Sequence, residues 1–249
     1  ALGGEQVEGR QAVRALLVAG RRRVRDLWLA EDVDRAAIVS DIVELATELR
    51  VPVRRVSRAE LEDEARSDAP QGVLAHAAPL PEVDLDVLCA PDPETGAQPF
   101  LVVLDGITDP QNVGAILRTA ECAGASGAVL PRHRAAHVTP SVAKAASGAI
   151  EHLPMAVVAG LPAALARARE LGVWAVGLDG AADTSLFDLP FAGEGVALVL
   201  GAEGRGIGRL TRARCDLTVS IPLRGALPSL NVSAAAALAC FELARRRPV

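Results

Sequence analysis

The sequence predicts an α/β protein with a small N-terminal domain and a larger domain built on a mostly parallel sheet with helices on both faces. From residue 100 onward, nearly continuous apolar segments alternate with helical patterns, which is typical of strands buried on both faces of a parallel sheet. A proline-rich stretch separates this region from an earlier, shorter α/β pattern. We therefore expect a first domain over residues 1–78, a linker over 79–99 and a second domain over 100–249.

The elements of the first domain follow from the spacing of its apolar residues. Ile38, Ile42, Leu45 and Leu49 recur at the three- and four-residue intervals of an amphipathic helix. Short apolar runs with strand character lie on either side of that segment. The expected helices cover residues 7–19, 38–49 and 58–64, and the expected strands cover 24–30, a segment that begins at 51, and 72–77.

In the second domain, strand and helix patterns alternate. The expected strands cover residues 100–104, 127–130, 155–158, 173–178, 196–200 and 217–221. The expected helices cover residues 113–123, 141–147, 161–171, 208–212 and 232–246, after a short linker helix at 85–88. Because ligands of parallel α/β sheets bind beyond the carboxyl ends of the strands, the candidate binding loops are 105–114, 178–183, 201–208 and 222–233.

Composition excludes several classes of protein. The 249 residues include 26 basic and 31 acidic side chains, a net charge of −5, which excludes a nucleic-acid binder that is basic throughout but leaves room for a local basic patch. Aromatic residues make up 2% of the chain, so recognition by stacked aromatic platforms is not expected. No apolar stretch reaches the roughly 18 residues of a membrane span, so we expect no membrane partner.

The cysteines and histidines do not suggest a metal site. The four cysteines are dispersed and form no C-x-x-C pair, which argues against a zinc ribbon and fits a reducing cytoplasm. His133 and His137 are four residues apart, but prolines flank them and no third ligand lies near in the sequence. We therefore expect a cytoplasmic protein without a bound metal.

A glycine-rich loop at 201–208 follows an expected buried strand. It is not a Walker phosphate loop, because the chain's one lysine, Lys144, lies elsewhere. It is not a dinucleotide fingerprint either, because Arg209 stands where the third glycine belongs. Its glycines suit either a tight structural turn or the close approach of backbone to a ligand, and the loop alone does not decide between them.

Polar residues near two expected helix starts each allow a structural and a functional interpretation. Asn112 is a good helix N-cap, and Arg118 pairs naturally with Glu121 one turn on, so neither needs a catalytic role. Ser229 or Asn231 caps the alanine-rich helix that follows. The N-terminal arginines, which include Arg10, Arg21, Arg22 and Arg23, form either a solvated turn or a patch that contacts phosphates.

Three ordered motifs together carry a more specific signal. Asn112-Val113-Gly114-Ala115-Ile116-Leu117-Arg118-Thr119-Ala120, Leu200-Gly201-Ala202-Glu203-Gly204-Arg205-Gly206, and Ile221-Pro222 with Ser229-Leu230-Asn231-Val232-Ser233 closely resemble the motifs of the SpoU family of RNA ribose 2′-O-methyltransferases, in the SPOUT superfamily. The first domain resembles that family's ribosomal-protein-like, substrate RNA-binding domain. The segment 148–154 resembles the branch that methylates a guanosine in the peptidyl-transferase region of 23S rRNA.

The resemblance implies a fold, a cofactor and a partner copy. The second domain would contain a deep trefoil knot whose loops hold S-adenosylmethionine, with Gly201, Ile221 and Leu230 at positions whose main chain contacts the cofactor. The protein would be a homodimer with the active site at the interface, and the alanine-rich final helix suits that packing.

The resemblance also implies catalytic residues and a substrate. Arg118 would be the catalytic residue, either as the base for the ribose 2′-hydroxyl or as the electrostatic stabiliser of the alkoxide, with Asn112, Glu203, Ser229 and Asn231 as the other polar site residues. The substrate would be RNA, a 23S rRNA guanosine first. The alternatives are a tRNA ribose methyltransferase, an antibiotic-resistance rRNA methylase and a non-catalytic RNA-binding assembly protein.

Overall fold

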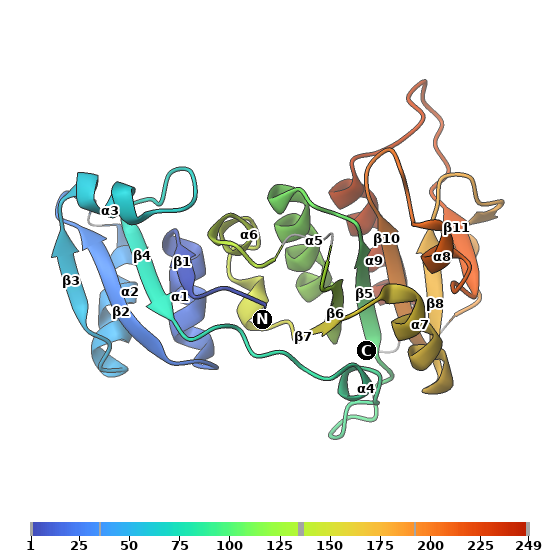
Figure 1. The fold of residues 1–249 in the computed structure, drawn as a ribbon, viewed down its shortest axis with the longest axis horizontal. Coiled ribbons are helices and arrows are strands. Elements are labelled where there is room, and N and C mark those ends of the chain that lie inside the picture. Colours follow the sequence, from blue (N-terminus) through green and yellow to red (C-terminus); the bar gives the residue numbers. More distant parts are fainter. Residues whose placement is uncertain (1, 35, 134–136, 192, 248–249) are drawn as a thin grey trace. The chain divides into compact units, whose positions relative to one another are not determined.

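The computed structural model describes residues 2–34, 36–133, 137–191 and 193–247 (Figure 1). The chain divides into two compact units. Unit 1 consists of residues 1–81 and 136–152, and unit 2 consists of residues 82–135 and 153–249. Among the described residues, no helix is long and apolar enough to cross a membrane.

Unit 1 contains a four-stranded sheet in the order β1-β4-β2-β3. Its strands are β1 (Gln6–Glu8), β2 (Val24–Ala30), β3 (Val53–Val56) and β4 (Val73–Ala77), and its first helices are α1 (Arg10–Ala19), α2 (Ala37–Glu48) and α3 (Arg58–Glu64). Strands β2 and β3 are parallel, and β4 is antiparallel to both β1 and β2. Apolar side chains of α1 and α2 pack on one face of this sheet in a single buried cluster that includes Val13, Leu16, Leu27 and Ile42.

The start of the first helix differs from the sequence prediction. Val7 was expected in a helix but lies in β1, and the helix begins at Arg10 after Gly9. Gly9 has a φ of 91°, which turns the chain between the two elements and favours glycine. Strand β1 forms because it pairs with β4, more than 60 residues later, so local spacing does not reveal it.

A segment from the expected second domain belongs to unit 1. It contains α6 (Pro140–Ala145) and the short 3₁₀ helix η1 (Ala149–Glu151). Gly148 lies against α1 so closely that a Cβ placed there would be 2.1 Å from the Cβ of Ala15. The Glu151 carboxylate forms a buried, two-pronged ion pair with Arg22. These contacts explain why residues 136–152 group with the N-terminal residues rather than with the rest of 100–249.

Unit 2 contains a seven-stranded sheet in the order β7-β6-β5-β10-β8-β11-β9. The sequence predicts a mostly parallel sheet, and all the pairings between its described strands are parallel. The strands are β5 (Phe100–Asp105), β6 (Gly127–Pro131), β7 (Met155–Val158), β8 (Val173–Leu178), β9 (Thr184–Ser185), β10 (Gly195–Gly201) and β11 (Leu217–Ser220). The helices are α4 (Leu85–Leu88), α5 (Pro110–Cys122), α7 (Leu161–Glu170), η2 (Leu186–Asp188), α8 (Arg209–Arg212) and α9 (Val232–Arg246). The two-residue strand β9 is the one strand of this sheet that the sequence did not predict.

Helices cover both faces of the large sheet (Figure 1). Helices α5 and α9 pack against each other on one face, and α4, α7 and α8 lie on the other. Alternate residues of β5 divide between the two layers, because Leu101 and Val103 join the buried cluster under α7 while their neighbours face the opposite side. The burial of both faces explains the continuous apolar character of the strands.

Candidate active site

The candidate binding loops lie at one edge of the large sheet. Asp105 at the end of β5 is paired in register with Gly201 at the end of β10, and Leu178 at the end of β8 is paired with Leu200 and Val219. Because all these strands are parallel, the loops that follow them leave from the same edge. This is also where the strand order reverses direction, between β5 and β10, and such a switch point is where α/β sheets bind ligands.

The glycine loop is a tight turn that requires glycine at its start. A Cβ on Gly201 would lie 2.1 Å from the backbone carbon of Gly206, so no larger residue fits without moving the loop. The Gly206 N–H donates to the Ala202 carbonyl at 2.8 Å and closes the turn. Gly204 and Gly206 adopt φ values of 74° and 65°, a region that favours glycine. The prediction that this loop forms a tight structural turn is therefore confirmed.

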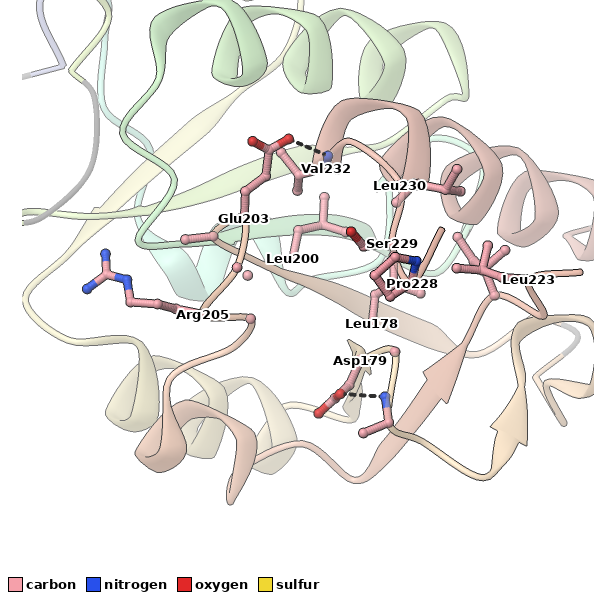
Figure 2. Close-up of a pocket in the computed structure, with 18 residues that line it drawn as sticks. Leu178, Asp179, Leu200, Glu203, Arg205, Leu223, Pro228, Ser229, Leu230 and Val232 are labelled. Atoms are coloured by element: carbon pink, nitrogen blue, oxygen red, sulfur yellow. Dashed lines mark hydrogen bonds between the residues drawn. The ribbon is translucent and has the colours of Figure 1, made fainter. Parts of the chain in front are cut away.

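The same loop also lines a pocket of about 440 Å³ (Figure 2). The three residues predicted to contact a cofactor, Gly201, Ile221 and Leu230, all line this pocket. The walls of the pocket are largely apolar, and backbone N–H and C=O groups of the loops supply hydrogen-bonding groups, as in sites for small organic cofactors. The pocket is lined by residues 178–181, 200–206, 221, 223, 228–230, 232 and 235.

Three predicted polar residues form one hydrogen-bond network beside the pocket. The Asn231 Nδ2 group donates to Asn112 Oδ1 at 3.0 Å and to Glu203 Oε1 at 2.7 Å. Glu203 Oε1 also accepts from the Val232 N–H at 3.2 Å, at the start of α9 (Figure 2). The structure thus brings together side chains from α5, the glycine loop and the start of α9, which are up to 119 residues apart.

The two helix starts resolve the capping alternatives differently. Asp109, not Asn112, caps α5, because its carboxylate accepts from the N–H groups of Gln111 and Asn112. The Asn112 side chain therefore serves the network rather than its own helix. Asn231 does cap α9, since its Oδ1 accepts from the N–H groups of Ser233 and Ala234 while its Nδ2 serves the network.

The sequence analysis missed Asp105 as a residue that supports the site. Its Oδ2 accepts a 2.7 Å hydrogen bond from the Gly208 N–H, which fixes the far end of the glycine loop to the end of β5. The signal in the sequence was an acidic residue at the end of an apolar strand. Its partner lies 103 residues later, so spacing did not reveal the contact.

Ser229 and Arg118 occupy different places. Ser229 lines the pocket, with Leu230 beside it (Figure 2). Arg118 lies on the exposed side of α5 and is not among the residues that line the pocket. Six residues separate it from Asn112, which places the two side chains about 120° apart around the helix axis. The Arg118 and Asn112 side chains therefore leave α5 in different directions.

The N-terminal arginines do not form one surface. Arg22 is buried, with 2% of its side chain exposed, and its guanidinium is held by Glu151 and the carbonyls of Gly4 and Ala78. The prediction that Arg22 contacts RNA is therefore corrected, because its charge is already paired in the interior. Arg10 pairs with Asp34, whereas Arg21 and Arg23 are exposed, although Arg21 also donates to the Glu151 carbonyl.

The cysteines beneath the site are not poised to react. Burial raises the pKa of the Cys215 thiol to about 11 and that of the Cys240 thiol to about 12, so both stay protonated at neutral pH. All four cysteines are free thiols. Among the described residues, no group of three or more His, Cys, Asp and Glu side chains is placed to hold a metal ion.

Two family descriptions match the chain, in the order of its sequence. Residues 6–83 match the domain described as RNA 2′-O ribose methyltransferase substrate binding. Residues 99–241 match the SpoU rRNA methylase family, which covers more than half of the chain. The three motifs and the pocket all lie within the second match.

Individual relatives match nearly the whole chain. A protein of Pseudomonas putida named 23S rRNA (guanosine-2′-O-)-methyltransferase RlmB is 38% identical over 98% of each chain. A Bacillus subtilis protein named putative TrmH family tRNA/rRNA methyltransferase YacO is also 38% identical, over 98% of this chain and 96% of its own. The crystal structure of the SpoU methyltransferase AviRb from Streptomyces viridochromogenes, in complex with AdoMet, superimposes with a TM-score of 0.79 at 28% identity and covers 96% of this chain and 89% of its own.

Proposed function

Because this chain belongs to the SpoU methylase family, we propose that it transfers a methyl group from S-adenosylmethionine to a ribose 2′-hydroxyl of RNA, in a guanosine of the peptidyl-transferase region of 23S rRNA. The observation that carries the proposal is the Asn112–Asn231–Glu203 network beside an apolar pocket formed by the glycine loop. The full-length similarity to proteins named as 23S rRNA guanosine methyltransferases supports this substrate. A non-catalytic RNA-binding protein would not need this polar set.

The pocket suits S-adenosylmethionine in size and in chemistry. Its volume of about 440 Å³ lies in the range of sites for organic cofactors. The side chains of Leu178, Ile221 and Leu230 supply apolar walls for a purine, and the backbone of the glycine loop supplies polar groups. When bound, the cofactor supplies a methyl group that its sulfonium has already activated.

The chain's own residues then have to position the ribose and handle its proton. We assign the positioning of ribose or phosphate to Asn112 and Asn231, whose side chains the network holds in fixed orientations. Glu203 holds this arrangement against the start of α9 through the Val232 N–H. Ser229 lies where the pocket lining meets α9 and completes the polar set.

Arg118 is our candidate for the catalytic residue. A guanidinium is a poor base and a good electrostatic stabiliser of a developing alkoxide. We favour the stabilising role on that ground. Because Arg118 is exposed on α5 and does not line the pocket of its own chain, we propose that it acts at the pocket of a second copy.

A homodimer would provide that second copy. The exposed side of α9, which packs beside α5, carries an apolar stripe of Ala234, Leu238 and Phe241. Leu238 and Phe241 are 45% and 52% exposed, and their alignment with Ala234 along one side of the helix supports a contact between copies. A two-fold contact through this layer would cover Arg118 as well.

The trefoil knot and the cellular location also belong to the proposal. The central place of β10 between β5 and β8, and the pocket shared by residues 200–206 and 221–230, support the family's knot in this region. Four free cysteines support a reducing compartment, and we place the protein in the cytoplasm. Within unit 1, Arg21 and Arg23 are the arginines we assign to RNA phosphates.

A methyl-transfer assay tests the proposal. Unmodified 23S rRNA and tRNA transcripts are incubated with the protein and tritiated S-adenosylmethionine, and the labelled nucleotide is mapped. We expect label on the 2′-oxygen of one guanosine in 23S rRNA. Label in tRNA alone would support the methyl-transfer reaction but contradict 23S rRNA as the substrate. A protein that binds no S-adenosylmethionine would contradict the proposed enzymatic activity.

A further inference from the structure

The loop after β8 contributes a charged side chain to the pocket that the three motifs do not include. Asp179 directly follows Leu178, the last residue of β8, and both line the pocket. Among the described residues, the other charged side chains in the lining are Glu203 and Arg205. Glu203 is engaged with Asn231, and the Arg205 side chain points away from the other labelled residues (Figure 2). Asp179 is thus the carboxylate in the lining that the polar network does not use.

The Asp179 carboxylate is held in one orientation by its neighbours. Its Oδ1 accepts from the Ala181 N–H at 2.9 Å, and its Oδ2 pairs with Arg212 Nε at 2.7 Å. The Asp179 backbone N–H donates to the Val219 carbonyl at 2.9 Å, which ties the residue to β11. Each carboxylate oxygen accepts about two hydrogen bonds, so each keeps one lone pair for a ligand. The side chain is 21% exposed, and the residue is part of the pocket lining.

Asp179 lies on the side of the pocket away from the polar network. In Figure 2, Asp179 lies on the opposite side of the pocket from Glu203 and Val232. The reacting methyl group must lie on the network side, where Asn112 and Asn231 meet. The opposite side therefore receives a part of the cofactor that does not react. The apolar walls at Ile221, Leu223 and Leu230 suit adenine, which leaves the ribose beside the carboxylate.

Resting on the proposed function, we propose that Asp179 binds the cofactor's ribose by accepting hydrogen bonds from its vicinal 2′- and 3′-hydroxyls. A vicinal diol presents two O–H donors at a spacing that a carboxylate matches with its two oxygens. Hydrogen bonds to an ionised acceptor are stronger than those between neutral groups. Acidic residues placed beyond a strand bind ribose hydroxyls in this way in dinucleotide-binding α/β folds.

Calorimetric binding of two ligands to the full-length protein tests the inference. The ligands are S-adenosylmethionine and 5′-methylthioadenosine, which keeps the adenine and ribose but lacks the amino acid and the positive charge. In Asp179→Asn, the amide oxygen still accepts from the Ala181 N–H, so the turn is retained. We expect the dissociation constants of both ligands to rise by about tenfold or more and by the same factor.

Arg212→Gln is the matched control, because it removes the ion pair but leaves the carboxylate. We expect it to bind both ligands within about twofold of the unaltered protein. Equal weakening in Arg212→Gln would assign Asp179 a structural role and overturn the inference. Weakened binding of S-adenosylmethionine alone would place the carboxylate at the amino-acid end and also overturn it.

The unaltered protein separates this inference from the function on which it rests. If it fails to bind S-adenosylmethionine, the proposed function fails and the inference fails with it. If it binds both ligands and Asp179→Asn binds them equally well, the inference alone fails.

Discussion

At the scale of single residues, one asparagine links the stability of a helix to the geometry of the candidate site. The Oδ1 atom of Asn231 caps α9, and its Nδ2 group holds Asn112 and Glu203. A serine or aspartate would cap the helix equally well but would lose the amide donor. The sequence leaves open whether Asn231 caps the helix or belongs to the site, and in the structure it does both.

We predict that Arg118→Ala loses methyl transfer and retains S-adenosylmethionine binding. Arg118 is exposed and lies outside the pocket lining, so its removal does not alter the pocket. Removing one electrostatic stabiliser costs about 100- to 1,000-fold in turnover. Single-turnover transfer and calorimetric binding measure the two effects separately. Parallel loss of binding and transfer would contradict the catalytic assignment.

We predict that Arg22→Met destabilises the protein by about 3–5 kcal/mol, because it leaves the Glu151 carboxylate buried without its partner. Urea unfolding at pH 7 measures the free energy. Arg23→Met is the matched control, because Arg23 is an exposed neighbour and its replacement should change stability by no more than about 0.5 kcal/mol. Equal effects of the two variants would show that the buried pair is not a special contact.

At the scale of elements, polar contacts in the loops and at the ends of helices and strands hold the site in place. The 201–208 loop is closed at one end by the Ala202–Gly206 bridge and at the other by Asp105. Helix α9 is fixed at its last turn, where Arg246 pairs with Glu242 and donates to the carbonyls of Phe187 and Leu189. Arg246 therefore ties the end of α9 to the backbone of residues 187 and 189.

We predict that Gly201→Ala weakens S-adenosylmethionine binding by more than about tenfold. The new methyl group would overlap the backbone of Gly206, so the loop has to move away from the pocket. Gly225→Ala is the control, since a Cβ at Gly225 meets no atom within 4 Å. Calorimetry compares the two variants. Unchanged affinity in Gly201→Ala would show that the loop relaxes without disturbing the pocket.

At the scale of the whole molecule, the chain divides into two units, and each unit is made of two separate segments of the sequence. Unit 2 carries the pocket and the polar network, and unit 1 includes a segment inserted from the middle of the sequence. The net charge of −5 means that RNA binding has to come from local groups of arginines. The exposed stripe on α9 is the surface to which we assign the proposed contact between copies.

We predict that Phe241→Glu converts a dimer into monomers and abolishes methyl transfer. The substitution places a charge on the apolar stripe that we assign to the contact between copies. Sedimentation equilibrium measures the mass. Val18→Glu is the control, because Val18 is a comparably exposed apolar residue, 51% exposed, on α1. A monomer that retains full activity would contradict the dimeric site.

We predict that replacing Arg21 and Arg23 together with glutamine weakens RNA binding and reduces its salt dependence. Each lost phosphate contact should lower the slope of log affinity against log salt by about 0.7–0.9. Filter binding over a series of salt concentrations measures the slope. A weaker affinity with an unchanged slope would mean that these arginines do not contact phosphates.

The sequence by itself determined the alternation of strands and helices, the parallel sheet and the three motifs, because each depends on spacing within a short segment. The resemblance that these motifs carry assigns Gly201, Ile221 and Leu230 to the cofactor, and the structure places these three residues in the lining of one pocket. Only the tertiary structure decided that Arg22 is buried, that the Asn112 side chain accepts from Asn231, and that the segment with α6 and η1 packs with unit 1. Those outcomes depend on contacts between residues that are neighbours in space but not in sequence, where burial and pairing of charge outweigh local preference.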